Sequence, residues 1–178
     1  MQALLRKLTP LNTALAVLAM AFATITGAWI FEYFGYAPCE LCLMQRWAYY
    51  AGVPLAAVNA LVAAKGPLMA QRPLLILLAL VFAGSSIFGI YHSGVEWGFW
   101  PGPTGCTGTS MPRASNMNDF MKQLQTTRVV RCDEVAIRIF GLSLAGWNAV
   151  ISAGMSTLAF LGASRSSSQR LASTPGLR

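Results

Sequence analysis

Charged side chains are scarce in this chain. Only 11% of its 178 residues are Asp, Glu, Lys or Arg, whereas about 25% is usual for soluble globular proteins. Apolar residues make up 55% of the chain, and the mean hydropathy is +0.52. This composition excludes an ordinary soluble domain and is typical of an integral membrane protein.

The apolar residues are concentrated in four runs, at 11–34, 43–64, 73–93 and 142–163. Each run has about the 20 residues that a helix needs to cross the hydrocarbon core of a bilayer. None shows the alternation of apolar and polar residues that marks membrane β-strands. Because only helices and closed barrels satisfy the backbone in a membrane, we predict an all-α bundle of four transmembrane helices. A long external loop, 94–141, joins the last two.

Acidic residues are rarer still, with six Asp and Glu against thirteen Lys and Arg. Seven basic residues and no acidic ones lie at one end of the spans: Arg6, Lys7, Lys65, Arg72, Arg165, Arg170 and Arg178. The six acids and the other six basic residues lie on the opposite side. The positive-inside rule then places both termini and the 65–72 loop in the cytoplasm. We interpret the basic residues as topology signals and expect no nucleic-acid partner.

The first run has a second interpretation as a cleavable signal peptide, because Ala21-Phe22-Ala23 resembles a cleavage site. The run continues to Phe31, which is longer than the apolar region of about 7–15 residues in a signal peptide. We therefore expect a retained first span. Residues 1–164 would form a single membrane domain, followed by a basic cytoplasmic tail at 165–178 that is expected to be disordered.

Cysteine and histidine are also few, with four cysteines and one histidine. Cys39 and Cys42 lie in the turn after the first span, and Cys106 and Cys132 lie in the long loop, so all four are predicted on the non-cytoplasmic side. Four cysteines allow three pairings. Zinc is disfavoured because the second pair lacks the short spacing of zinc ligands and His92 is the lone histidine. We expect no metal site.

The Cys39-Glu-Leu-Cys42 pair is better suited to thiol–disulfide exchange than to bracing the fold. A disulfide that spans only two intervening residues closes a short loop and therefore adds little to the stability of the fold. Pro38 ends the preceding helix, so a new helix is predicted to begin near Glu40 or Leu41. Cys42 then lies in its first turn, where the helix dipole favours a thiolate. Glu40 places an anion beside Cys39, which is expected to raise the pKa of that thiol.

Arg46 is predicted on the same helix face as Cys42, one turn further into the span, with Tyr49 about one turn beyond it. A cation beside a nucleophilic sulfur would stabilise the anionic adduct formed when a thiolate attacks an electron-poor, lipid-soluble ring. The alternative is that Arg46 extends to the lipid headgroups, as long cations near helix ends do.

The long loop is rich in turn residues from Trp100 to Gly108, which predicts that Cys106 is exposed and mobile. Beyond it, residues 116–124 are predicted to form a short amphipathic helix. The apolar stripe of that helix suits either the membrane surface or the bundle.

Several of these features together closely resemble the disulfide bond formation protein B (DsbB) family. They are the Cys39-Glu-Leu-Cys42 motif with Arg46, the four spans, the run YHSGVEWGFWPGPTGC that ends at Cys106, and Cys132-Asp-Glu leading to Phe140-Gly-Leu-Ser. The resemblance covers residues 14–163. It implies an enzyme of the bacterial inner membrane that reoxidises a soluble periplasmic thioredoxin-fold oxidase (DsbA-like) and passes the electrons to ubiquinone or menaquinone.

The resemblance also implies roles for the cysteines. Cys106 would take the attack of the partner's thiolate, with Cys132 as its loop partner. Cys39 and Cys42 would form the second redox-active pair and exchange with the first. Cys42 would be the sulfur that faces quinone.

Three further residues are candidate quinone contacts. Arg46 would help to bind or polarise the ring. His92 lies where the family often has a histidine, and its plainer interpretation is a polar residue at a helix end. Tyr49 shares the predicted Cys42 face, and its plainer interpretation is a member of the interfacial aromatic belt.

The sequence is also compatible with a function that is not enzymatic. The chain would then be a non-enzymatic membrane scaffold whose loop is held by two structural disulfides. In that case Arg46 is dispensable and the cysteines do not respond to quinone.

Overall fold

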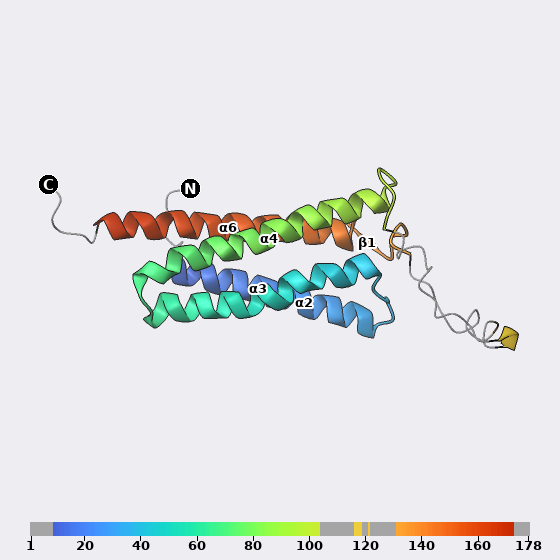
Figure 1. The fold of residues 1–178 in the computed structure, drawn as a ribbon, viewed down its shortest axis with the longest axis horizontal. Coiled ribbons are helices and arrows are strands. Elements are labelled where there is room, and N and C mark those ends of the chain that lie inside the picture. Colours follow the sequence, from blue (N-terminus) through green and yellow to red (C-terminus); the bar gives the residue numbers. More distant parts are fainter. Residues whose placement is uncertain (1–8, 104–115, 119–120, 122–130, 173–178) are drawn as a thin grey trace.

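The computed structural model describes residues 9–103, 116–118, 121 and 131–172. Its long helices are α2 (Pro10–Tyr33), α3 (Glu40–Lys65), α4 (Leu68–Glu96) and α6 (Leu144–Ala172). They run antiparallel along one axis (Figure 1), and each contains a stretch long and apolar enough to cross a membrane. The predicted all-α bundle of four membrane helices is confirmed. Cys106 and most of the predicted amphipathic helix lie outside the described residues.

Local side-chain chemistry sets both ends of α2. Thr9 caps the helix by accepting a hydrogen bond from a backbone N–H at 3.1 Å, and Pro10 occupies the first helical position, where its missing N–H removes no helical bond. The helix ends at Tyr33, and Gly35 follows with a φ of 94°, a conformation that favours glycine. The chain then leads to Cys39, which caps α3.

Helix α4 begins at Leu68, five residues before the predicted start of the third span. Pro73 therefore lies inside the helix, near its beginning, where it removes a single backbone hydrogen bond. Pro54 lies near the middle of α3. Neighbouring helices and local adjustments compensate for such prolines in membrane helices, which is why proline was a poor marker of the helix start here.

A small hairpin, which the sequence analysis did not predict, leads into α6. Strand β1 (Arg138–Ile139) pairs antiparallel with β2 (Leu142–Ser143). The two residues between them, Phe140 and Gly141, have φ values of 51° and 84°, as a type I′ turn requires. The Trp147 indole N–H donates to the last carbonyl of β1 at 2.9 Å, so the hairpin is tied to the first turn of α6.

Helix α6 extends past the predicted end of the fourth span and continues to Ala172. The tail that was expected to be disordered from residue 165 is thus helical as far as Ala172. No glycine or proline occurs in residues 163–172. Because extending a helix costs much less than nucleating one, the basic segment continues α6.

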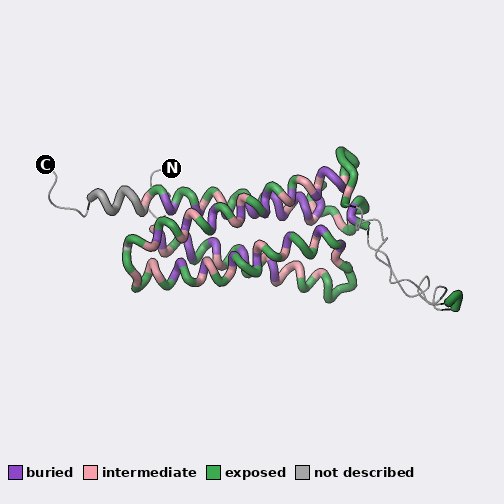
Figure 2. Tube along the Cα trace, viewed as in Figure 1, coloured by how far each residue is buried: buried purple, intermediate pink, exposed green. Residues whose placement is uncertain are grey.

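The outer faces of the helices are apolar, as a lipid environment requires. Several large apolar side chains there are 58–65% exposed, namely Phe22, Leu61, Leu80 and Phe160. Buried residues follow the inner faces of the bundle (Figure 2). They include hydroxyl and amide side chains as well as apolar ones, so the interior holds polar groups that would be costly against lipid.

Helices α4 and α6 share the most extensive interface. Ser86 donates to the Ala149 carbonyl at 2.9 Å, and Ser156 donates to the Ala79 carbonyl at 2.8 Å. Gly89 faces Ala149 so closely that a Cβ atom at Gly89 would lie 2.9 Å from the Ala149 backbone nitrogen. Small residues thus bring the two backbones together, as is usual between membrane helices.

This close approach predicts that Gly89→Ala destabilises the bundle. The new methyl group would push against the Ala149 backbone, and overpacking of this kind costs about 1–3 kcal/mol. Gly84→Ala on the same helix is the matched control, because a Cβ there meets nothing within 4 Å. Thermal unfolding in detergent measures both variants, and equal stability of the two would contradict the prediction.

Candidate functional site

Two free thiols lie at the start of α3. Cys39 is the residue that caps the helix, and its Sγ accepts a hydrogen bond from the Cys42 backbone N–H at 3.3 Å. The Cys39 and Cys42 sulfur atoms lie 2.8 Å apart, within hydrogen-bonding distance. Cys42 is therefore in the first turn, as predicted, with the sulfurs close enough for exchange chemistry.

His92 of α4 approaches this pair from the side of Cys39. Its Nε2 lies 3.6 Å from Cys39 Sγ, and its Nδ1 lies 2.9 Å from Nε2 of Gln45. The imidazole is almost fully buried, with 1% exposed. Because the Gln45 amide nitrogen donates to Nδ1, the imidazole proton is on Nε2 and points at the Cys39 sulfur.

The pKa of the Cys39 thiol is lowered to about 5 from its ordinary value of 9.0. The hydrogen bond with the Cys42 side chain lowers it most, burial opposes that effect, and the contact with His92 lowers it further. The expectation that Glu40 would raise this pKa was wrong. Glu40 is exposed, so water screens its charge, whereas the buried neighbours act at short range.

Cys132 lies close to the same pair. It is disulfide-bonded and 1% exposed. It belongs to the buried apolar cluster that contains Cys39, Leu41 and Val95. A loop cysteine and a cysteine of α3 are thus packed in one cluster, although they are far apart in the sequence.

The ligand atoms of Cys39, Cys42 and His92 all lie within 4.8 Å of one another, a grouping able to hold a metal ion. The fold thus brings the lone histidine to the cysteines, although they are far apart in the sequence. Two sulfurs on one tetrahedral zinc, each at about 2.3 Å, would lie about 3.8 Å apart. The observed separation of 2.8 Å is too short for two sulfurs on one zinc ion.

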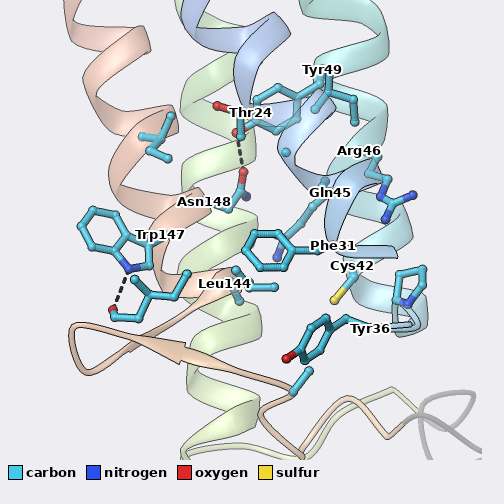
Figure 3. Close-up of a pocket in the computed structure, with 18 of the residues that line it drawn as sticks. Thr24, Phe31, Tyr36, Cys42, Gln45, Arg46, Tyr49, Leu144, Trp147 and Asn148 are labelled. Atoms are coloured by element: carbon cyan, nitrogen blue, oxygen red, sulfur yellow. Dashed lines mark hydrogen bonds between the residues drawn. The ribbon is translucent and has the colours of Figure 1, made fainter. Parts of the chain in front are cut away.

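A pocket of about 350 Å³ lies beside Cys42 (Figure 3). Helices α2, α3 and α6 and the segment before α6 line it. Its apolar walls include Ile25, Phe31, Leu144, Trp147 and Ile151. The polar side chains that line it include Cys42, Gln45, Arg46, Tyr49 and Asn148. A largely apolar cavity with a few polar groups is the usual form of a small-molecule site.

Arg46 is held at this pocket by an ion pair. Its Nη1 lies 2.6 Å from Oε2 of Glu32, in the last turn of α2. The Arg46 side chain is 11% exposed, and that of Glu32 is 45% exposed. The guanidinium is therefore a fixed cation, one helical turn from Cys42.

Tyr49 joins a buried polar network at the deeper end of the pocket. Its hydroxyl donates to Asn148 Oδ1 at 2.6 Å and lies 3.2 Å from Ser152 Oγ. Ser152 in turn donates to Ser85 Oγ at 3.1 Å. The network joins α3, α6 and α4, and it orients the Tyr49 and Asn148 side chains that line the pocket.

Comparison with known proteins agrees with this arrangement. The family described as disulfide bond formation protein DsbB matches residues 11–162. The chain belongs to the DsbB family. It is also similar to the uncharacterized protein RP370 of Rickettsia prowazekii (strain Madrid E), with 26% identity over 150 residues and 83% of each chain covered. No solved structure matches the chain.

In this DsbB-family chain, the fold brings three predicted site residues, Cys42, Arg46 and Tyr49, to one pocket. His92 contacts Cys39 and is not among the residues that line that pocket. Cys132 is packed with Cys39, as an exchange between the two pairs would require.

Sequence reasoning missed Glu32, Gln45 and Asn148 as site residues. A signal was available, because polar and ionisable side chains inside membrane spans are costly and often mark functional positions. Their partners could not be identified without the packing of α2, α4 and α6 around α3.

The lowered pKa of Cys39 predicts one thiolate per chain at neutral pH when the α3 pair is reduced. Its ultraviolet absorbance should disappear only as pH falls through about 5. His92→Ala removes an N–H that stabilises the thiolate, so the pH at which half of the thiolate absorbance is lost should rise. Glu40→Gln, the control, should leave it unchanged. A midpoint near 9.0 in the unmodified protein would contradict the prediction.

Proposed function

We propose that this chain is a thiol:quinone oxidoreductase, which oxidises the dithiol of a soluble periplasmic thioredoxin-fold protein of the DsbA type and transfers the electrons to membrane quinone. The observation that carries the proposal is the position of one cysteine pair between two environments. Cys39 packs in the cluster that contains Cys132, and Cys42 lines the membrane pocket.

In the proposed relay, a thiolate of the partner attacks Cys106 of a Cys106–Cys132 disulfide and forms a mixed disulfide. The partner's second thiolate then displaces Cys106, so the partner leaves oxidised and the loop pair holds two electrons and two protons. Two further exchanges move them to Cys39 and Cys42. Each exchange breaks one S–S bond and forms one, so it needs no metal or external oxidant.

The position of His92 beside Cys39 supports this relay. His92 would assist the transfer by directing its Nε2 proton at Cys39, which stabilises that sulfur as a leaving thiolate.

The pocket beside Cys42 fits a quinone. Apolar walls suit the ring and its tail, Arg46 supplies a cation near Cys42, and Asn148 has a buried amide nitrogen without a hydrogen-bond partner among the described residues. When bound, quinone accepts two electrons and two protons and leaves as quinol. Arg46 would hold a carbonyl oxygen beside Cys42 and favour negative charge there.

We further propose that the protein lies in the bacterial inner membrane with all four cysteines on the periplasmic side. The support is the concentration of basic residues at the ends opposite the cysteine turn. An oxidising compartment suits disulfide relay chemistry.

The proposal predicts that Cys42→Ser abolishes electron transfer to quinone. The full-length oxidised protein is mixed without oxygen with a short-chain quinone and a reduced DsbA-type partner, and quinone absorbance is followed. Val58→Ala is the control, because Val58 lies on α3 with a lipid-facing side chain, 47% exposed, and it should retain full activity. If the unmodified protein reduces no quinone and its cysteines stay paired, the protein is instead a non-enzymatic scaffold whose loop is held by two structural disulfides.

Arg46→Ala should weaken the quinone step alone. Loss of a charged hydrogen bond of about 1.5–3 kcal/mol corresponds to an increase of about 10- to 100-fold in the KM for quinone. The rate of disulfide exchange with the partner protein in a single turnover should not change. Lys65→Ala, a basic residue at the other end of α3, is the matched control. An unchanged quinone KM in Arg46→Ala would assign this arginine to the headgroup region.

A further inference from the structure

Asn148 presents an unused hydrogen-bond donor at the deeper end of the pocket. Its side-chain oxygen accepts from the Tyr49 hydroxyl at 2.6 Å. The Ser152 hydroxyl, which donates its one proton to Ser85, lies 3.4 Å from the same oxygen. The Nδ2 of Asn148 has no partner among the described residues, although Asn148 is 8% exposed. Figure 3 shows this nitrogen on the side of the amide that faces Phe31 and Gln45, across the cavity.

An unpaired buried amide N–H is unfavourable, and such groups in native proteins call for an explanation. Among the described residues, four buried side-chain atoms lack a partner: Thr13 Oγ1, Thr26 Oγ1, Ser93 Oγ and Asn148 Nδ2. Only the last belongs to a residue that lines the pocket. Its orientation is set by the Tyr49 hydroxyl, which donates to the amide oxygen and leaves the nitrogen to the cavity.

We propose that Asn148 forms a second binding subsite, in which Nδ2 donates a hydrogen bond to the quinone carbonyl that points away from Cys42. The inference rests on the proposed function, since it assumes that a quinone occupies the pocket. Tyr49, which bonds to Asn148, lies seven residues after Cys42, or about 10 Å along the α3 axis. This length accommodates a ring with one carbonyl near Arg46 and the other at Asn148.

The chemistry of this subsite also bears on selectivity. An amide N–H has no acceptor capacity, so Nδ2 pairs well with a carbonyl oxygen and less well with the hydroxyl group of a quinol. Asn148 therefore favours the oxidised ligand over the reduced product. Tyr49 acts as a positioning residue, because its hydroxyl holds the amide oxygen and does not itself meet the second carbonyl.

The test measures binding and a spectroscopic signature without turnover. The oxidised full-length protein in detergent is titrated with a short-chain ubiquinone, and quenching of tryptophan fluorescence gives the Kd. Infrared spectra of the same quinone, labelled with carbon-13 at one or the other ring carbonyl, report hydrogen bonding to each. In the unmodified protein, both carbonyl bands should lie below those of quinone in empty micelles.

Asn148→Leu should return one of the two carbonyl bands to its position in empty micelles. It should weaken quinone binding about 3- to 10-fold, as expected for one lost hydrogen bond. Val150→Ala is the matched control, because Val150 lies on the same helix with an exposed side chain and does not line the pocket. Both bands should stay lowered in that variant, and its Kd should stay within about twofold of the unmodified value.

Two results would overturn the subsite and leave the proposed function intact. One is quinone binding by Asn148→Leu with unchanged affinity and unchanged bands. The other is an unmodified protein that binds quinone with only one carbonyl band lowered, a result that needs no variant to fold. If the unmodified protein binds no quinone, the proposed function fails together with the subsite.

Discussion

The hydrogen bond from the Cys42 backbone N–H to the Cys39 sulfur fixes the point at which α3 begins. From that point the helical repeat decides where every later side chain of the site lies. Gln45 reaches both His92 and the pocket, and Cys42, Arg46 and Tyr49 line the pocket beside it. A start shifted by one residue would rotate these side chains by about 100° around the helix. The two sulfurs would then no longer face different surroundings.

The rest of the bundle is governed by the cost of polar groups in hydrocarbon. Buried hydroxyl groups of α4 and α6 donate to carbonyls across the interface, and close backbone contact leaves little space there. Helices α2 and α6 share a smaller interface, and the pocket lies between them and α3. Helices α4 and α6 thus form a closely packed pair. The smaller contact between α2 and α6 leaves room for the pocket.

Hydropathy and charge predicted the four spans, because the bilayer restricts what can cross it. The start of α3 was predictable from Pro38 and the residues after it. The contact between Cys39 and His92 was not, since it joins residues 53 positions apart through the packing of α3 on α4. The Arg46–Glu32 pair needed the packing of α2 in the same way. The hairpin at Phe140 lacked the Asn-Gly or Asp-Gly signal that marks such turns.

The capping interaction also bears on the direction of electron transfer in the proposed relay. The Cys42 side chain, its backbone N–H and His92 all lower the pKa of Cys39, so they stabilise the thiolate and hence the reduced form of the α3 pair. A pair whose reduced form is stabilised is the stronger oxidant, and electrons then move toward it from the loop cysteines. Reoxidation of such a pair requires an electron acceptor whose reduction potential is higher than that of the pair. The Arg46 cation and the Asn148 amide nitrogen, both facing the cavity beside Cys42, are the groups in this chain suited to make a quinone that acceptor.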